Sequence, residues 1–174
     1  MQEVISRLRP RFPEAKWLAP GLSPQDRPEK PEWNTQLWLN AWKSIGVDRF
    51  VDGFCAHAYW QTMKEPPEPP LGHDDMRAET GGLAWLAVKR TFPGKPVYVS
   101  EFSNNSPGVD FREKGRQYRA YREVLKQHGA AAAFGFVLKW SPRISDSPDN
   151  HESWVNDRPV AGSLGVAEGM LSTA

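Results

Sequence analysis

Four apolar stretches alternate with amphipathic stretches along the chain, and this alternation limits the possible folds more than any other feature. The second stretch, VDGFCAHAY at Val51–Tyr59, is nearly continuous, as expected of a strand buried on both faces of a parallel sheet. The third, KPVYVSEF at Lys95–Phe102, is rich in residues that favour strands. The pattern predicts four strands, at Ala15–Leu22, Val51–Tyr59, Lys95–Phe102 and Ala130–Trp140.

Helical periodicity separates these strands. Asn34 can cap one of the helices, and Gly129 is a C-cap after another. The expected helices are Gln2–Arg9, Asn34–Ser44, Asp74–Thr91, Asp110–His128 and Pro159–Met170. In the second of them, four apolar residues are expected on the buried side: Leu37, Trp38, Ala41 and Trp42. Strands joined by helices imply right-handed crossovers, so the sequence predicts an α/β fold with a parallel sheet.

The connections favour a barrel over an open sheet. Each strand is followed by a longer polar loop, whereas helices lead into the next strand through short turns such as PGK at 93–95. In barrels this asymmetry places the chemistry at the carboxyl ends of the strands. A flavodoxin-like sheet also fits the alternation, but it should carry a phosphate-binding loop, and the sequence shows none. The 174 residues fit one domain, yet are short for a complete (β/α)₈ barrel of about 250 residues.

Charge and composition exclude several classes of protein. Lys and Arg number 22 against 21 for Asp and Glu, so no basic surface points to nucleic acid. No apolar stretch is long enough to span a membrane. Met1–Pro10 carries charges where a secretion signal needs an apolar core, which favours a cytoplasmic location.

Neither the cysteine nor the histidines suggest a metal or a cofactor. The single cysteine, Cys55, lies in an apolar stretch and is expected to be a buried thiol. The four histidines are scattered without ligand spacing: His57, His73, His128 and His151. We therefore expect no metal and no cofactor.

Residues able to act on a substrate end three of the strands. The second strand ends in His57 and Tyr59 and is followed by Trp60. The third ends in Ser-Glu-Phe with Glu101 at its centre, and Asn104 follows. The fourth ends in Trp140 after Lys139. In a parallel barrel these strand ends share one rim, so the residues are expected to converge there.

These strand ends resemble those of the large clan of retaining (β/α)₈ glycoside hydrolases. VYVSEF at 97–102 resembles the clan's strand seven, in which an apolar run delivers the nucleophilic Glu as T-E-F, S-E-F or T-E-W. LKW at 138–140 is similar to strand eight, and HAY at 57–59 is similar to strand six. The resemblance covers nearly the whole chain, as strands five to eight with their helices. It implies the C-terminal half of such a barrel.

The resemblance also implies roles for individual residues. Glu101 matches the nucleophile, and Tyr59 could donate a hydrogen bond that keeps it ionised. His57 could contact a sugar hydroxyl, and Trp140 could stack on the sugar ring. The strand-end positions of Trp60 and Asn104 add them to the expected substrate-binding set. The expected ligand is a poly- or oligosaccharide.

One essential residue of the clan has no counterpart. A retaining glycosidase needs a second carboxyl as acid/base, which the clan places at the end of strand four, usually after Asn. The sequence has no Asn-Glu pair, and Asp26 and Glu29 follow the wrong strand. Two readings remain: part of a glycosidase, or a non-catalytic carbohydrate-binding or structural module derived from one. An esterase-like enzyme is disfavoured because no G-x-S-x-G motif is present.

Four βα units cannot close a barrel, because closure couples strand number, tilt and shear. The strands near Ala15 and Ala130 would be left as open edges, which invite pairing with another chain. Inward-facing apolar side chains would also be uncovered, among them Phe54 or Cys55, Val97 or Val99, and Phe136 or Leu138. We therefore expect a partner, either a chain that carries the N-terminal half-barrel or a second copy of this chain.

Overall fold

Four parallel strands form one sheet in the order β1–β2–β3–β4. The computed structural model describes residues 1–22, 34–60, 76–104 and 111–136. The strands are β1 (Leu18–Leu22), β2 (Gly53–Trp60), β3 (Val97–Asn104) and β4 (Ala132–Gly135). The helices are α1 (Gln2–Leu8), α2 (Thr35–Ser44), α3 (Leu86–Thr91) and α4 (Phe111–His128), with 3₁₀ turns at Arg9–Arg11 and Val47–Arg49. This is the expected α/β fold, with the parallel strands and alternating helices of a partial barrel.

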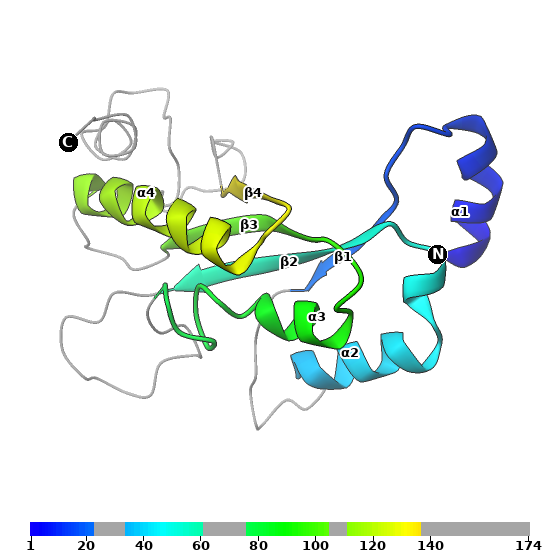
Figure 1. Ribbon diagram of the computed structural model, residues 1–174, viewed down its shortest axis with the longest axis horizontal. Helices are drawn as coiled ribbons and strands as arrows, with labels where there is room; N and C mark the ends of the chain where they lie inside the picture. Colours follow the sequence, from blue (N-terminus) through cyan, green and yellow to red (C-terminus); the bar gives the residue numbers. More distant parts are fainter. Residues whose placement is uncertain (23–33, 61–75, 105–110, 137–174) are drawn as a thin grey trace, which may run out of the picture.

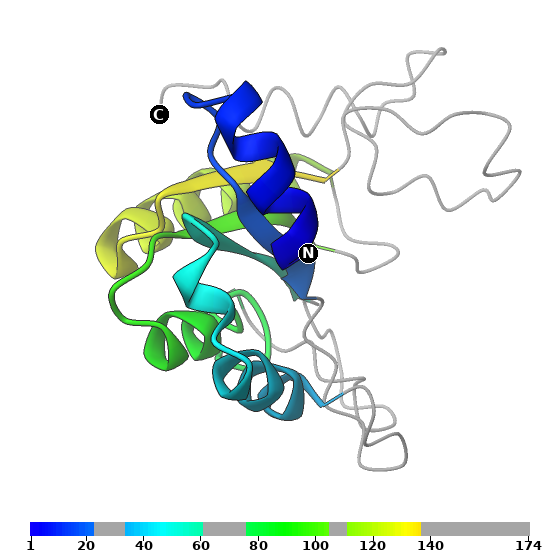
Figure 2. The same ribbon diagram turned by 90° about the vertical axis from the view of Figure 1, so that its right-hand side faces the viewer.

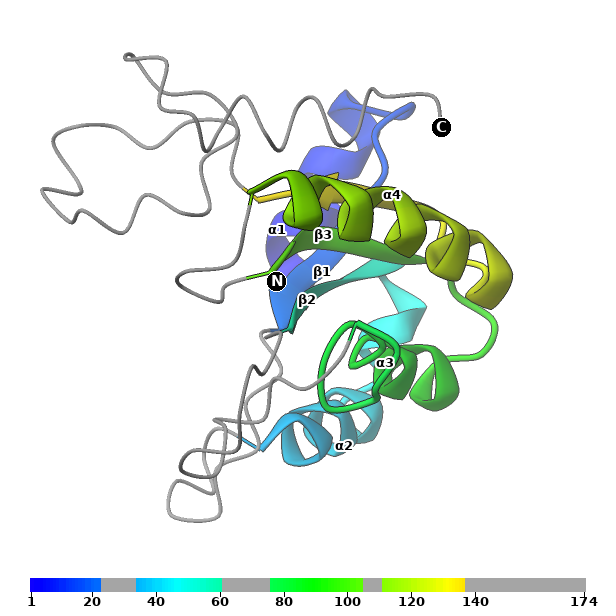
Figure 3. The same ribbon diagram turned by 90° about the vertical axis from the view of Figure 1, so that its left-hand side faces the viewer.

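The helices α2, α3 and α4 follow one another around one face of the sheet (Figure 1, Figure 3). Seen from the amino ends of the strands, α1 stands in front of the sheet instead of in that layer (Figure 2). Asn34 caps α2 as expected, since its side chain accepts a hydrogen bond from the Leu37 N–H at 3.0 Å. Gly129 ends α4 with a φ of 70°. Among the described helices, none is both long and apolar enough to cross a bilayer.

The two faces of the sheet differ in what they carry. On β2, the residues Phe54, Ala56, Ala58 and Trp60 are buried beneath the helices, and the alternate residues Cys55, His57 and Tyr59 are half-buried. Because side chains of a strand point alternately to its two faces, the second set lies on the face turned away from the helices. We call this the inner face, since in a barrel it faces the axis.

An aromatic cluster fixes α4 on the sheet. The Trp60 ring lies 4.8 Å from the Tyr121 ring and stacks on Phe102, with 6.4 Å between ring centroids. Phe102 in turn meets Tyr118 edge-on at 5.6 Å. Rings in offset or edge-on contact stabilise a core beyond their buried area.

The prediction that certain apolar side chains face inward and are left uncovered is only partly right. Phe54, Val97 and Val99 are fully buried under the helices instead of facing inward. The thiol of Cys55 is half-buried on the inner face and is not the buried core thiol that we expected, and Phe136 is also half-buried. The inner face is thus mainly polar and aromatic, whereas the large apolar residues pack against the helices.

Two helix predictions were wrong in detail. On α2, Leu39 and Trp42 are buried, but Leu37 and Trp38 are 55% and 49% exposed and Ala41 is exposed too. The helix turns the Leu39–Trp42 side to the sheet, where Trp42 meets Phe54, so the remaining apolar stripe faces outward.

The helix expected over 74–91 is restricted to α3. Residues 76–85 form turns, and Gly82 lies so close to Met76 that a Cβ there would meet the Met76 carbonyl oxygen at 2.1 Å. The chain needs glycine for this close approach, and the glycine pair at 81–82 disfavours helix. The expected final helix and the end of the fourth strand lie outside the described residues.

Candidate active site

A β-bulge places Glu101 on the inner face. Val97 and Val99 are buried on the helix face of β3, so strict alternation would bury Glu101 on that face too. The pairing with β2 shifts between Ala56↔Val99 and His57↔Glu101, and the pairing with β4 shifts over the same stretch of β3. One extra residue in a strand redirects the following side chain. The bulge at Ser100 therefore brings Glu101 to the face that carries His57 and Tyr59.

Three predicted site residues meet there. The Tyr59 hydroxyl donates a hydrogen bond to Oε2 of Glu101, and Nδ1 of His57 lies 3.3 Å from the same oxygen. The Oε1 atom accepts no hydrogen bond from the residues that the structure describes. The side chains of His57 and Glu101 are 21% and 30% exposed. One oxygen of the carboxylate is held, and the other is open to a ligand.

The imidazole of His57 is held in its neutral form. Burial lowers the pKa of His57, and the negative charge of Glu101 opposes that change without reversing it. A neutral imidazole with its proton on Nδ1 would present that N–H to the carboxylate. His57 and Tyr59 are then both neutral donors that face one carboxylate oxygen, and hydrogen bonds to a charged oxygen are stronger than those to a neutral one.

Two further expected residues lie elsewhere. Trp60 is 1% exposed, and its ring N–H donates to Gln117 on α4 at 2.9 Å. Asn104 is fully buried and also donates to Gln117, at 2.7 Å. Both were predicted to bind substrate because they end their strands, but both anchor β2 and β3 to α4. Trp140 lies outside the described residues.

Three neighbours of the site were not predicted as part of it. The Tyr59 ring meets Phe136 edge-on, with 6.1 Å between ring centroids. Ser100 forms the bulge, and its hydroxyl lies 3.4 Å from the Ala56 carbonyl oxygen. Gly21 on β1 lies against the imidazole of His57. The sequence signal for Gly21 was a glycine inside a strand, which often marks a close approach of two segments.

Glu101 is the one carboxylate within the four described strands. No cluster of three metal-binding side chains occurs in residues 1–22, 34–60, 76–104 and 111–136. The chemistry that this group can support is that of a single positioned carboxylate with two neutral donors beside it.

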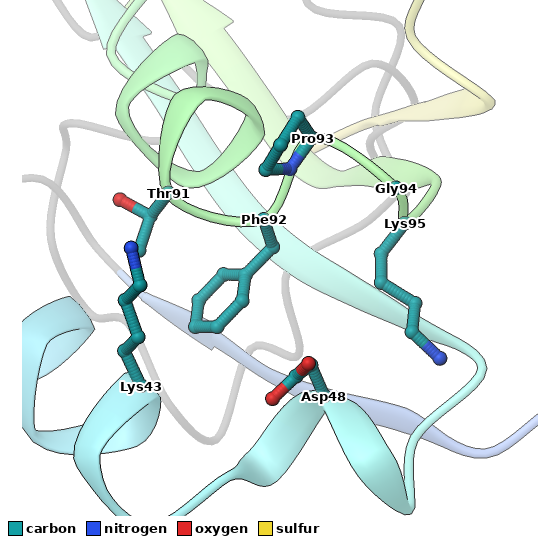
Figure 4. A pocket seen from close by; sticks show the side chains of 7 residues that line it. All are labelled: Lys43, Asp48, Thr91, Phe92, Pro93, Gly94 and Lys95. Carbon is teal, nitrogen blue, oxygen red and sulfur yellow. The ribbon is translucent and has the colours of Figure 1, made fainter.

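A hollow at the other end of the sheet has a different character. It is bordered by Lys43, Asp48 and residues 91–95 (Figure 4). Phe92 in its wall stacks on Phe54, with 4.1 Å between ring centroids, and the Lys95 ammonium donates to the Val51 carbonyl at 2.8 Å. The hollow is thus a gap between α2 and α3 at the amino ends of the strands.

No family model and no curated protein matches this chain. Among solved structures, a xyloglucanase of Paenibacillus polymyxa from glycoside hydrolase family 44 is similar, with a TM-score of 0.50 and 14% identity. The match covers 79% of this chain and 36% of the xyloglucanase. An exo-β-1,3-glucanase of Aureobasidium namibiae from family GH128 aligns with a TM-score of 0.49 and 18% identity, over 97% of this chain and 57% of its own. This chain therefore shares the fold of part of the xyloglucanase. It spans less than two thirds of the length of either neighbour.

Proposed function

We propose that this chain is the nucleophile-bearing half of a (β/α)₈ glycoside hydrolase that cleaves a poly- or oligosaccharide with retention. Residues 1–174 would form the single half-barrel domain, equivalent to strands five to eight. The observation that carries the proposal is the Glu101 carboxylate, held at Oε2 by Tyr59 and His57 and open at Oε1.

This geometry suits a nucleophile. A carboxylate attacks the anomeric carbon only in its ionised form, and the hydrogen bond from Tyr59 fixes the orientation of the Glu101 carboxylate. With Oε2 held, Oε1 is the oxygen that bonds to the anomeric carbon as the glycosidic bond breaks, and a second carboxyl protonates the departing oxygen. The negative charge then leaves Glu101, and the hydrogen bond to Oε2 weakens. Hydrolysis of the glycosyl-enzyme returns the charge and restores the hydrogen bond.

The acid/base must come from outside the described strands. A retaining mechanism requires a second carboxyl about 5–5.5 Å from the first. The described strands carry no second carboxylate. We propose that polypeptide equivalent to strands one to four supplies it and completes the barrel. Trp140 remains our proposed stacking surface for the sugar.

The open edges of the sheet and exposed apolar side chains at α2 support such a partner. In the described part of the chain β1 and β4 are the outer strands of the sheet. On the outward side of α2, Leu37 within the helix and Ile45 directly after it are 55% and 69% exposed. A neighbouring helix of a completed barrel would cover these side chains. The second arrangement that we expected, pairing of two copies of this chain, would cover the edges without supplying an acid at the strand-four position.

Analytical ultracentrifugation of the chain at micromolar concentration tests the need for a partner. We expect self-association or poor cooperativity of thermal unfolding in the isolated chain, and a single cooperative species when the N-terminal half is present. A well-folded monomer without a partner would contradict the half-barrel proposal.

The alternative is a carbohydrate-binding module without catalysis. Its specific support is that the described strands carry one carboxylate instead of two. In that case His57, Tyr59 and Glu101 would bind sugar hydroxyls by hydrogen bonds alone.

A fluorinated glycosyl inactivator separates the two functions. Such a reagent forms a glycosyl-enzyme that hydrolyses slowly, so peptide mass spectrometry locates the nucleophile. We expect the adduct on Glu101 in the completed barrel, and none in Glu101→Gln treated in the same way. Saccharide binding without any adduct would support the module, and an adduct on another carboxylate would contradict our assignment.

A further inference from the structure

The imidazole of His57 rests directly on the backbone of Gly21. A Cβ added to Gly21 would lie 2.4 Å from Nε2 of His57 and 2.7 Å from its Cδ2. It would also lie 2.9 Å from the Ser100 hydroxyl. Real Cβ atoms are essentially never found this close to a neighbour, so any side chain at Gly21 requires one of these groups to move.

The backbone conformation does not explain the glycine. In the described residues, positive φ angles occur only at Gly46 and Gly129, so Gly21 has a conformation open to other residues. Within a strand, glycine destabilises the fold relative to residues with side chains, by roughly 0.5–1 kcal/mol relative to Ala. The close approach of His57 is therefore the physical reason for glycine at this position.

Gly21 also lies in the stretch of β1 whose pairing with β2 is irregular. The register between β1 and β2 shifts between Ala19↔Phe54 and Leu22↔Ala56, so the irregular stretch of β1 includes Gly21. The β3 bulge that turns Glu101 inward lies at Ser100, whose hydroxyl also borders the Gly21 site. Irregularities in two strands thus meet around one imidazole.

We infer that Gly21 is a positioning residue for the site: its missing side chain leaves the space in which His57 stands with Nδ1 toward Glu101. The inference about geometry stands on the contacts above, and its consequence for turnover rests on the proposed function. The imidazole lies between Gly21 on one side and the carboxylate on the other. A residue at position 21 therefore acts on Glu101 through His57, without touching the carboxylate.

The expected response to Gly21→Ala is movement of the ring and not loss of the fold. The atoms in the way belong to side chains, and no backbone atom is among the nearest three. Ordinary contact begins at 3.4 Å, so relief of the 2.4 Å approach needs a displacement of about 1 Å. A shift of that size disrupts a 3.3 Å contact with Glu101.

The electrostatic coupling between His57 and Glu101 is the readout. Glu101 is the charged group that raises the pKa of His57, and neutralising it in Glu101→Gln should lower the His57 pKa further. The other groups bordering the ring are the Tyr59 and Ser100 hydroxyls, from β2 and β3. NMR titration of the imidazole C–H signals in the full chain measures the pKa difference with and without the Glu101 charge. We expect this difference to fall by at least half when Gly21→Ala is present in both proteins.

Gly94→Ala is the matched control, because a Cβ at Gly94 would meet nothing within 4 Å. It should leave the coupling unchanged. An unchanged coupling in Gly21→Ala would overturn the inference.

A comparison of Gly21→Ala in two backgrounds, the wild type and His57→Ala, keeps the test decisive if Gly21→Ala folds poorly. In a His57→Ala background the closest obstacle is gone, so Gly21→Ala should lower the melting temperature much less than it does in the wild type. An equal loss in both backgrounds would overturn the inference.

In the completed barrel, Gly21→Ala should also lower kcat/KM by roughly 10- to 100-fold, as expected for a misplacement of about 1 Å. Absence of turnover in the wild-type barrel would refute the proposed function, whereas the NMR coupling would still decide the role of Gly21.

Discussion

At the amino end of the sheet, Asp52 uses both of its carboxylate oxygens. Oδ1 accepts a hydrogen bond from Arg9 at 3.1 Å, and Oδ2 accepts one from the Trp17 N–H at 2.8 Å. At the carboxyl end, Glu101 has both of its neighbours at Oε2 and none of the described donors at Oε1. Asp52 directly precedes β2 and Glu101 lies within β3, and each carboxylate has two partners.

The difference separates a structural carboxylate from one available for chemistry. Asp52 joins β2 to the segments before β1, and the backbone hydrogen bond from Trp17, with help from Arg9, lowers its pKa. Each carboxylate oxygen of Asp52 therefore already accepts a hydrogen bond within the fold. Glu101 keeps one oxygen open at the end of the sheet where parallel α/β proteins place their sites. Conservative changes from acid to amide at the two ends should therefore have opposite effects.

The largest effect is expected for Glu101→Gln in the completed barrel. The amide keeps the shape but cannot attack the anomeric carbon, so turnover should fall by about 10⁴-fold or more. Stability should change little, because the amide oxygen can take the place of Oε2 beside Tyr59 and His57, and no described donor is lost at the place of Oε1. Initial rates on an aryl glycoside and a thermal melt measure both quantities. Turnover near the wild-type rate would show that Glu101 is not the nucleophile.

Removing the hydroxyl in Tyr59→Phe should have the next largest effect. The hydrogen bond holds Oε2 and so orients Oε1 toward the sugar, and a reacting group misplaced by about 1 Å costs roughly 10- to 100-fold in kcat. The ring contact with Phe136 is retained, so the fold should be unaffected. If kcat were unchanged and only KM rose, Tyr59 would be a sugar contact instead of a support for Glu101.

The sequence was sufficient for the strands and their parallel order, because long apolar runs and helical spacing recur in strict alternation. It was not sufficient for the face on which each residue lies. Strict alternation from Val97 and Val99 buries Glu101, and only the bulge at Ser100 reverses this. Such a bulge depends on pairing with both neighbouring strands, which local sequence does not encode. The resemblance to the strand-seven motif placed Glu101 at the site without explaining how it turns inward.

Trp60 and α2 show a different failure, in which the sequence-based assignment put residues on the wrong side of a strand or helix. Trp60 was assigned to the site because it ends its strand, although alternation with Phe54 predicts that it lies on the helix face, where it is buried. Leu37 and Trp38 were assigned to the core because they are apolar, but the sheet contacts the Leu39–Trp42 side of α2. Hydrophobicity predicts that a surface is covered, and does not predict which neighbour covers it.

At the amino end, Asp52→Asn should lower stability and leave the chemistry intact. The amide removes the charge that Arg9 meets and turns a donor toward either Arg9 or the Trp17 N–H, so the free energy of unfolding should fall by about 1–3 kcal/mol. Chemical denaturation at pH 7 measures the loss. The kcat of the completed barrel should stay within about twofold of the wild-type value, because substitutions at distant sites without shared partners act independently of each other. A large loss of kcat would mean that the two ends are coupled.

The smallest effect, and the sharpest test of the comparison, is the pH dependence of stability at the two ends. Asp52 has a lowered pKa in the fold, so its contribution is present above the ordinary aspartate value of about 3.9 and is lost as pH falls through the folded value. His57 also has a lowered pKa, but it is a base. As pH falls below about 6.5, the unfolded chain takes up a proton that the folded protein resists, so stability is lost in that higher window.

Each of the two pH ranges in which stability is lost should depend on a residue at one end of the sheet. Replacing His57 with Gln should flatten the loss of stability just below pH 6.5 and leave the acid-side loss in place. Replacing Asp52 with Asn should do the reverse. Denaturant midpoints between about pH 3 and 8 separate the steps. If Glu101→Gln made the His57 step smaller instead of larger, the carboxylate would not be stabilising the protonated imidazole, and the contact between them would not carry the electrostatic weight that we assign to it.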